Sequence, residues 1–342
     1  NGKIYLLYRP RRFGKSLLVS TLKCYFEGKK ELFKGLAIDK LEKDWKQYPV
    51  FHLSFGGQNF VEPYALDKVL EEFVAMAERI YGREELAETL GSRFKAVLGN
   101  AHKKTGMRAV VLIDEYDKPL LDVMDMDIPV GKTQNKISLE EYNRNLLKGF
   151  YSVFKAADAN LQFVLLTGVT KFSQVSVFSG FNQPNDISMD EHYEALCGIT
   201  EDELYSTFDE QIKAMAVRYK ITEEGMKYKL KRKFDGYHFS PNMLDIYNPF
   251  SILNALSKKI LADYFYHKGI PYQYEKPLLL QGFGVVYPDF TFLSKKTRKE
   301  IYWEHEGMMD KPEYAKSAVK KIESYQRNGI HLGERLILTF ET

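Results

Sequence analysis

A basic loop between an apolar strand and a helix is the feature that most limits how this chain can fold. Residues 3–8 are apolar and strand-like, and residues 17–26 carry a helical pattern. The loop between them reads Arg9-Pro10-Arg11-Arg12-Phe13-Gly14-Lys15-Ser16. Such a loop holds phosphate with backbone N–H groups, its lysine and its hydroxyl. Because Arg9 stands where the usual pattern has its first glycine, a basic turn before an amphipathic helix is the alternative interpretation.

A second motif lies at the end of a buried strand and decides between these interpretations. The apolar run 109–113 is typical of a strand in a parallel sheet, and it ends in Asp114 and Glu115. P-loop NTPases place a magnesium-binding Asp and a group that orients the attacking water in this region. The next strand, 163–166, ends at Thr167, which would either sense the γ-phosphate or cap the following turn. The two motifs in this order predict a site for ATP or GTP with Mg²⁺.

The two motifs assign roles to particular residues. We expect Lys15 and Glu115 to be catalytic, and Ser16 and Asp114 to hold Mg²⁺. The residues expected to contact the nucleotide are Arg12, Phe13, Gly14, Lys15, Ser16, Leu17 and Thr167. The three arginines of the loop either neutralise phosphate or hold the loop against acidic neighbours such as Asp117, and at least one phosphate contact is favoured.

The order of strands and helices predicts an α/β P-loop NTPase fold with a three-layer parallel sheet. Strands are expected at 3–8, 49–55, 109–113 and 163–166, and helices at 17–26, 67–81, 84–104 and 139–157. Helical patterns at 200–219 and 222–234 predict a lid, and the pattern changes again near residue 257. We therefore expect an ATPase core at 1–190, a helical lid subdomain at 191–257 and a smaller α/β domain at 258–342.

Five signatures in order resemble the bacterial AAA-ATPase-like family over roughly residues 1–255. They are the loop 9–16, Phe33-Lys34-Gly35-Leu36, Asp114-Glu115-Tyr116-Asp117-Lys118-Pro119, Thr167-Gly168-Val169-Thr170-Lys171-Phe172 and Asp235-Gly236-Tyr237-His238-Phe239. The resemblance implies ATP rather than GTP, hydrolysis, a helical lid and a homo-oligomer as one possible assembly. The family's usual layout begins upstream of Asn1, which predicts a shortened N-terminus, and members commonly carry a nuclease-type domain after the ATPase.

In the C-terminal part, 258–342, the pattern predicts a helix up to residue 268, three strand-like segments, a helix at 312–328 and a last strand at 335–340. This part is similar to PD-(D/E)xK nucleases, whose core runs helix, three strands, helix, strand. Asp289 and Glu304 are expected on adjacent strands, where a hairpin would place them side by side as catalytic, Mg²⁺-holding acids. The position two after Glu304 holds Glu306 instead of the usual lysine. We expect Lys321, on the following helix, to supply that lysine as a third catalytic group, with Tyr325 one turn later.

Each of these C-terminal residues also has an ordinary structural interpretation. Asp289 follows a proline, which is a common turn or cap arrangement, and Lys321 would otherwise lie on a solvated helix face. Glu275 is either a further acidic member or a surface residue, and His305 is more typical of a structural strand position than of a base. The basic cluster Lys295, Lys296, Arg298 and Lys299 would meet a phosphate backbone or form a charged hairpin tip.

Composition narrows the setting and the partners. The net charge of +3 over 342 residues neither requires nor excludes a nucleic acid. Cys24 and Cys197 have no metal-type spacing, which favours a reducing, cytoplasmic setting. No apolar run approaches the roughly 20 residues that span a bilayer, so we expect no membrane partner.

Two hypotheses of different classes follow. The first is an ATP-driven switch or motor joined to a nuclease-type effector that acts on DNA or RNA. The second is a nucleotide-dependent interaction module whose C-terminal domain binds nucleic acid or protein without cutting, and Glu306 in the lysine position favours it. A nucleotide-binding protein that barely hydrolyses is a third possibility, because the first glycine of the loop is missing.

Overall fold

The chain forms two compact units in a computed structural model. The first contains Asn1–Glu203 and Asp235–Pro249, and the second contains Leu204–Phe234 and Phe250–Thr342. The structure describes residues 3–131, 136–170, 184–234, 237, 239, 244–253, 255–256, 265, 270–274, 276–294, 297–306 and 312–340. The predicted boundaries at residues 190 and 257 stay predictions.

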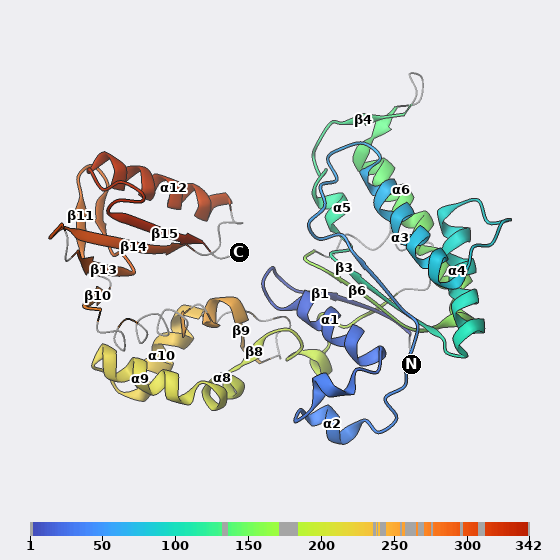
Figure 1. Cartoon of the computed structure of the whole chain (residues 1–342), viewed down its shortest axis with the longest axis horizontal. Coiled ribbons are helices and arrows are strands. Elements are labelled where there is room, and N and C mark those ends of the chain that lie inside the picture. Colours follow the sequence, from blue (N-terminus) through green and yellow to red (C-terminus); the bar gives the residue numbers. More distant parts are fainter. Residues whose placement is uncertain are drawn as a thin grey trace. The chain divides into compact units, whose positions relative to one another are not determined.

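A five-stranded parallel sheet forms the centre of the first unit (Figure 1). Its order is β2-β3-β6-β1-β7, and each neighbouring pair is parallel. The strands are β1 (Ile4–Tyr8), β2 (Val50–Ser54), β3 (Ala109–Asp114), β6 (Leu161–Gly168) and β7 (Asn185–Asp186). The α/β prediction is confirmed for this unit. Because the strands are parallel, the loops after β1, β3 and β6 leave from the same edge of the sheet.

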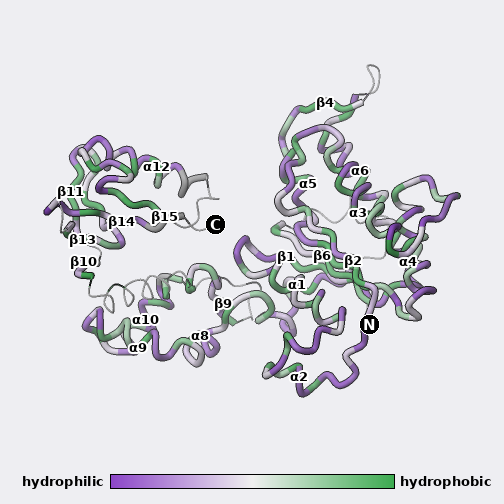
Figure 2. Tube along the Cα trace, viewed as in Figure 1, coloured by the Kyte–Doolittle hydropathy of each residue, from purple (hydrophilic) through white to green (hydrophobic). Residues whose placement is uncertain are grey.

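Helices cover both faces of this sheet, which explains the continuous apolar runs of its central strands. Alternate residues of β3 enter two cores: Val111 and Ile113 pack on one side, and Val110 and Leu112 on the other. The first core contains α3 (Ala65–Tyr81), α4 (Leu90–Thr105), α6 (Leu139–Tyr151) and α7 (Val153–Ala156), and the second contains α1 (Lys15–Phe26). Figure 2 shows the apolar residues concentrated along β1, β3 and β6.

Several boundaries differ from the sequence prediction. The helix expected from residue 84 begins at Leu90, because Thr89 and Ser92 form a reciprocal capping box there. The helix expected over 139–157 is divided into α6 and α7 at Ser152. Elements too short for a periodic signal were not expected: η1 (Lys30–Phe33), α2 (Ala37–Leu41), α5 (Lys118–Leu121), β4 (Pro129–Val130), β5 (Ile137–Ser138), η2 (Asp158–Asn160) and η3 (Glu191–Tyr193).

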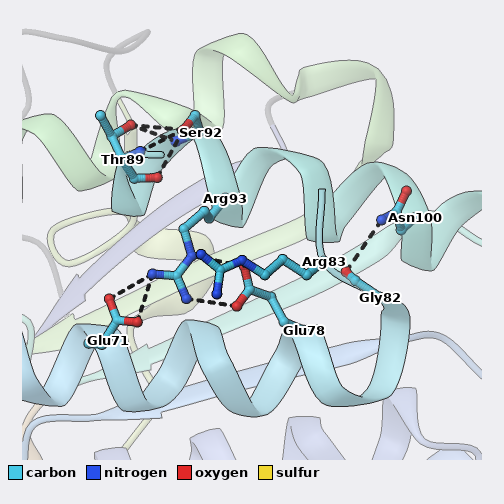
Figure 3. A network of polar contacts seen from close by, with 8 residues as sticks. All are labelled: Glu71, Glu78, Gly82, Arg83, Thr89, Ser92, Arg93 and Asn100. Atoms are coloured by element: carbon cyan, nitrogen blue, oxygen red, sulfur yellow. Dashed lines mark hydrogen bonds and ion pairs between the residues drawn. The ribbon is translucent and has the colours of Figure 1, made fainter. Parts of the chain in front are cut away.

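A buried arginine joins α3 to α4 (Figure 3). Arg93 donates from Nε and Nη2 to the two carboxylate oxygens of Glu78, at 2.8 and 2.7 Å, and from Nη1 to Glu71. Arg93 and Glu78 are both more than nine-tenths buried, whereas Glu71 is half exposed. These bonds lower the pKa of Glu78 below its usual value of 4.5. These bonds therefore connect α3 directly to α4.

The predicted lid helices are present, with one break. The helix expected over 200–219 is divided at Phe208. The helices are α8 (Glu201–Thr207), α9 (Asp209–Tyr219) and α10 (Glu223–Phe234). In the first unit, the short strands β8 (Ile199–Thr200) and β9 (Ile246–Tyr247) pair antiparallel on either side of the helical excursion.

A mixed four-stranded sheet lies in the second unit, in the order β10-β13-β14-β15. The strands of this sheet are β10 (Tyr272–Tyr274), β13 (Phe290–Leu293), β14 (Glu300–Glu306) and β15 (Leu336–Phe340). Helix α12 (Pro312–Arg327) follows β14 in the chain, and a hairpin of β11 (Leu278–Leu280) and β12 (Gly284–Val286) is inserted before β13. β14 pairs parallel with β15, and the other pairs are antiparallel. The expected helix at 312–328 and the last strand are confirmed. The helix expected at 258–268 lies almost wholly outside the described residues.

Among the described residues, no helix has the length and apolar character needed to cross a bilayer.

Candidate functional site

The loop after β1 is shaped by a glycine in a left-handed conformation. Gly14 has φ of 87° and directly precedes α1, which begins at Lys15. A Cβ built on Gly14 would meet no atom within 4 Å, so the backbone angle, not crowding, favours glycine here. The first-turn N–H groups of α1 have no carbonyl partner within the helix, and they form an anion-binding end. Ser16 and Leu17 lie exposed in this first turn.

Lys15 lies under the loop and close to the acids of β3. Its side chain is 8% exposed, and its Nζ donates to the carbonyl oxygens of Arg9 at 2.8 Å and Pro10 at 3.0 Å. Burial lowers the pKa of Lys15, and the charge of Asp114 is the largest effect in the opposite direction. Asp117 and Glu115 act on the lysine in the same way as Asp114. The structure therefore brings the two sequence motifs together.

Asp114 is fixed by two donors at the end of β3. The Thr167 hydroxyl, at the end of the adjacent strand β6, donates to Asp114 Oδ1 at 2.5 Å. The Glu115 backbone N–H donates to the same oxygen at 3.1 Å. The hydroxyl of Thr167 thus points toward Asp114, and Asp117 holds the turn after β6. Asp117 Oδ2 accepts from the N–H groups of Val169 and Thr170, both at 2.7 Å.

Glu115 extends toward the end of β2. Its φ is 55°, an uncommon angle for a non-glycine residue. A Cβ built on Gly56 would lie 3.5 Å from the Glu115 carboxyl carbon and 3.2 Å from Ser54 Oγ, so Glu115 lies directly over Gly56. Burial and the charge of Asp114 raise the pKa of Glu115. The sequence offered no signal for Ser54 or Gly56, because they lie at and just after the end of a different strand, β2.

Arg9 is a buried anchor of the loop. Its guanidinium donates to the main-chain oxygens of Ser188, Tyr193, Leu196 and Tyr8, and it is fully buried. The donors of Arg9 thus point to carbonyl groups, and the expected phosphate contact from at least one arginine of the loop stays a prediction. The backbone at Arg9 has no positive φ, which explains why the first glycine of the usual pattern is not needed. Arg11 is exposed and Arg12 is half-buried.

Phe13 does not project from the loop into solvent. Its ring is buried and packs edge-on against Tyr237, at 4.7 Å between centroids, and Phe239, at 5.6 Å. Tyr237 and Phe239 belong to the Asp-Gly-Tyr-His-Phe signature, whose role the sequence did not predict. One sequence feature could have indicated this packing: the loop has an arginine in place of its first glycine, and the chain also carries an aromatic signature that could pack against it.

A second polar cluster lies in the sheet of the second unit. Phe290 of β13 pairs with Trp303 of β14, so the same antiparallel register brings the preceding Asp289 beside Glu304. Both acids are more than nine-tenths buried. Burial raises the pKa of Glu304 most, and the charge of Asp289 raises it further. The two carboxyl groups therefore lie within electrostatic reach of each other, as the strand register also indicates.

Helix α12 supplies two partners to Glu304. Lys321 Nζ donates to Glu304 Oε2 at 2.8 Å, and the Tyr325 hydroxyl donates to Oε1 at 2.5 Å. The structure therefore brings together Asp289, Glu304, Lys321 and Tyr325. In the parts of the chain that the structure describes, no group of three or more His, Cys, Asp or Glu side chains is arranged to hold a metal ion.

Some predicted residues lie outside the described part of the structure. They are Lys171, Phe172, Asp235, Gly236, His238, Glu275, Lys295, Lys296 and the side chains of His305 and Glu306.

The first unit has the architecture of a P-loop-like domain: a parallel sheet, a basic loop before a helix after β1, and an acid pair after β3. The profile of a family described as predicted AAA-ATPase, AAA-ATPase-like, matches residues 1–178. The chain belongs to this AAA-ATPase-like family. Membership indicates ATP binding, typically with Mg²⁺.

A protein of Azotobacter chroococcum mcd 1, described as an uncharacterized protein in the vnfD 5′ region, is similar over a longer stretch. The two are 35% identical over 271 residues, which are 79% of this chain and 48% of that protein. The chain therefore spans about half the length of this relative. The match is longer than the 178 residues of the family profile, so it includes sequence from beyond that region.

Proposed function

We propose that the first unit binds and hydrolyses ATP. The observation that carries this proposal is the convergence of Lys15, Asp114 and Thr167 beneath the loop of a parallel sheet. Lys15 would exchange its bonds to the carbonyls of Arg9 and Pro10 for β- and γ-phosphate oxygens. The backbone of residues 12–17 would hold the phosphates at the start of α1.

The donor set fits magnesium, which prefers oxygen ligands. Ser16 and Asp114 would hold the ion, which would neutralise phosphate charge. Since Thr167 and the Glu115 N–H both donate to Asp114 Oδ1, coordination would fall to Oδ2. Glu115 would accept a hydrogen bond from the attacking water and orient it toward the γ-phosphate. Thr167 would sense the γ-phosphate through its link to Asp114.

Calorimetric titration of the full chain with Mg-ATP tests binding directly. Lys15→Ala should weaken ATP binding by at least tenfold, because the β and γ charges lose their buried partner. Lys148→Ala is the matched control, since Lys148 is exposed on α6. Equal affinity of Lys15→Ala and the wild-type chain would contradict the assignment.

We further propose that the second unit carries a metal-dependent nuclease-type site that acts on DNA or RNA. The buried acids are Asp289, directly before β13, and Glu304, on the adjacent strand β14, and Lys321 donates from its amine to Glu304. Asp289 and Glu304 would hold Mg²⁺, which would supply Lewis-acid activation of a phosphodiester. Lys321 would orient the attacking water. The sequence-based hypothesis that Lys321 on α12 supplies the lysine of the nuclease motif is kept in this proposal.

Cleavage of single- and double-stranded DNA and RNA with Mg²⁺ or Mn²⁺ tests this second site. Glu304→Gln should abolish cutting and leave ATP hydrolysis within about twofold, since the change lies outside the nucleotide site. Glu323→Gln, an exposed change on α12, is the control. A wild-type chain that cuts none of these substrates with either metal would contradict the proposal.

The bonding of Glu304 favours a second candidate function. Both of its oxygens accept bonds from α12, and no three-ligand group is found within the described residues. These bonds suit a structural carboxylate in a domain that binds nucleic acid or protein without cutting. Retained binding of a labelled oligonucleotide without cleavage, in both the wild type and Glu304→Gln, would support this candidate.

A further inference from the structure

The chain that follows α10 returns to the first unit and contacts the loop after β1. We call its described part the return segment, Tyr237, Phe239 and residues 244–248. It contributes the signature aromatics and the strand β9. Its contacts fall on three positions of the loop, Arg9, Arg11 and Phe13.

The strongest contact is between a buried cation and an aromatic face. The Arg9 Cζ lies 3.9 Å from the centroid of the Phe239 ring. Arg9 is fully buried, and burial lowers its pKa, so the guanidinium has lost its hydration shell. A cation over an aromatic face is attracted most strongly when it is desolvated in this way. Phe239 therefore stabilises the charged side chain that replaces the first glycine.

Two further contacts hold the same loop. The Phe13 ring packs edge-on against both signature aromatics. Asn248 Nδ2 donates to the Arg11 carbonyl oxygen at 3.4 Å. The loop is thus restrained at alternate residues along its length, and the restraints come from a segment more than 220 residues later in the chain.

Arg9 also connects these restraints to the catalytic lysine. The carbonyl oxygen of Arg9 accepts the 2.8 Å bond from Lys15 Nζ, so the position of the Arg9 backbone fixes that of the amine. Displacing the Arg9 side chain would shift the carbonyl that holds Lys15. A change at Phe239 would therefore displace the Lys15 amine, although Phe239 itself would not contact the nucleotide.

We infer that Phe239 is a positioning residue of the nucleotide site, which keeps the loop in its phosphate-binding shape through the stack on Arg9. This inference rests on the proposed ATP binding. It predicts that ATP affinity depends on an aromatic face at position 239 and not merely on apolar volume there.

The test compares Phe239→Leu, which keeps an apolar side chain without a π face, with Phe239→Tyr, which keeps the face. ATP affinity is measured by calorimetry with Mg-ATP on the full chain. We expect Phe239→Leu to weaken binding about tenfold, and Phe239→Tyr to stay within about threefold of the wild type. Phe283→Leu, at an exposed phenylalanine of the second unit, is the matched control.

Hydrogen exchange of the loop amides at residues 11–16, in the nucleotide-free protein, is the second readout. Faster exchange in Phe239→Leu than in Phe239→Tyr would support the inference. If the wild type binds no ATP, the proposed function is overturned, but this exchange result would still support the positioning role of Phe239. Wild-type affinity and protection in Phe239→Leu would overturn the inference. So would equal losses in both variants, because the aromatic face would then not be the cause.

Discussion

At the scale of single residues, Asp114 connects two strands of the first sheet to the loop that contains Lys15. It ends β3, accepts from Thr167 of β6 and lies within electrostatic reach of the lysine. A buried carboxylate needs such donors, because an unpaired charge in the interior is costly. If the first unit binds ATP as proposed, the same hydrogen bond would hold the threonine hydroxyl near the γ-phosphate.

Replacing Thr167 by valine removes this donor and keeps the shape of the side chain. We expect the kcat of ATP hydrolysis to fall at least tenfold, with KM for ATP within about threefold, because the hydroxyl positions the acid and contributes little to binding. Steady-state phosphate release measures both values. Thr21→Val, which changes an exposed hydroxyl of α1, should leave them unchanged. A Thr167→Val variant with wild-type kcat would contradict this role.

The buried pair of Arg93 and Glu78 predicts a pH-dependent contribution to stability. The folded pKa of Glu78 is depressed, so its contribution is present above about pH 4.5 and is lost as the pH falls through the folded value. Glu78→Gln should lower the free energy of unfolding by about 3 kcal/mol at pH 7, and by progressively less in acid.

The two tryptophans of the chain allow this measurement in one unit. Trp45 packs against Phe33 in the first unit, and Trp303 lies in the second. Urea unfolding followed by Trp45 fluorescence in a Trp303→Phe background gives the required free energy. Glu72→Gln, exposed on the same helix, is the control. A Glu78→Gln loss that is the same at every pH would contradict the pKa argument.

Sequence reasoning pointed to residues that the structure brings close together, but not to the residues that support them. Lys15, Asp114 and Glu115 were predictable because motif chemistry and strand ends fix them. The role of Arg9 was not, because its partners lie at Ser188, Tyr193, Leu196 and Phe239, far away in the chain. Periodicity and motif spacing report on local structure, whereas a buried arginine is defined by what surrounds it.

At the scale of elements, the turn from β1 into α1 depends on Gly14. Gly14→Ala would force an alanine to φ of 87°, which costs about 1–2 kcal/mol in a left-handed conformation. We expect weaker ATP binding in calorimetry, by roughly tenfold. Gly149→Ala is a sharp control, because that glycine lies exposed within α6 with open space around it. It should be stabilising by about 0.5–1 kcal/mol, and equal binding in both variants would contradict the role of Gly14.

The long elements were predictable and the short ones were not. The strands β3 and β6 and the helices α3 and α12 follow clear apolar patterns, and each was expected near its observed position. The hairpin of β4 and β5 has two residues in each strand, which is too little for any period to appear. The late start of α4 depends on a capping box that Ser92 forms in place of the usual Glu or Gln.

At the scale of the whole molecule, the chain has two units with separate apolar cores. The change in pattern near residue 257 led us to expect three domains, and their boundaries stay predictions. The path of the chain between the units was not predictable. Helices α9 and α10 belong to the second unit, and residues 235–249 then return to the first. Only the three-dimensional contacts of the return segment show this, since its sequence carries no boundary signal.

Two units with separate cores should unfold in separate transitions. We expect the Trp45 signal in Trp303→Phe and the Trp303 signal in Trp45→Phe to have different midpoints in urea. Mg-ATP should raise the midpoint of the Trp45 transition, because ligand binding stabilises the folded first unit. A single coincident transition, shifted equally by Mg-ATP with both reporters, would contradict this organisation.

The most direct test of the central claim is single-turnover ATP hydrolysis by the wild-type chain and Glu115→Gln, with Mg-ATP binding measured on the same preparations. The account predicts that Glu115→Gln binds ATP within about threefold of the wild type, while the rate of hydrolysis falls by about 10²–10⁴. The reason is that the carboxylate orients water and does not hold the phosphates. Hydrolysis by Glu115→Gln at the wild-type rate would contradict the account.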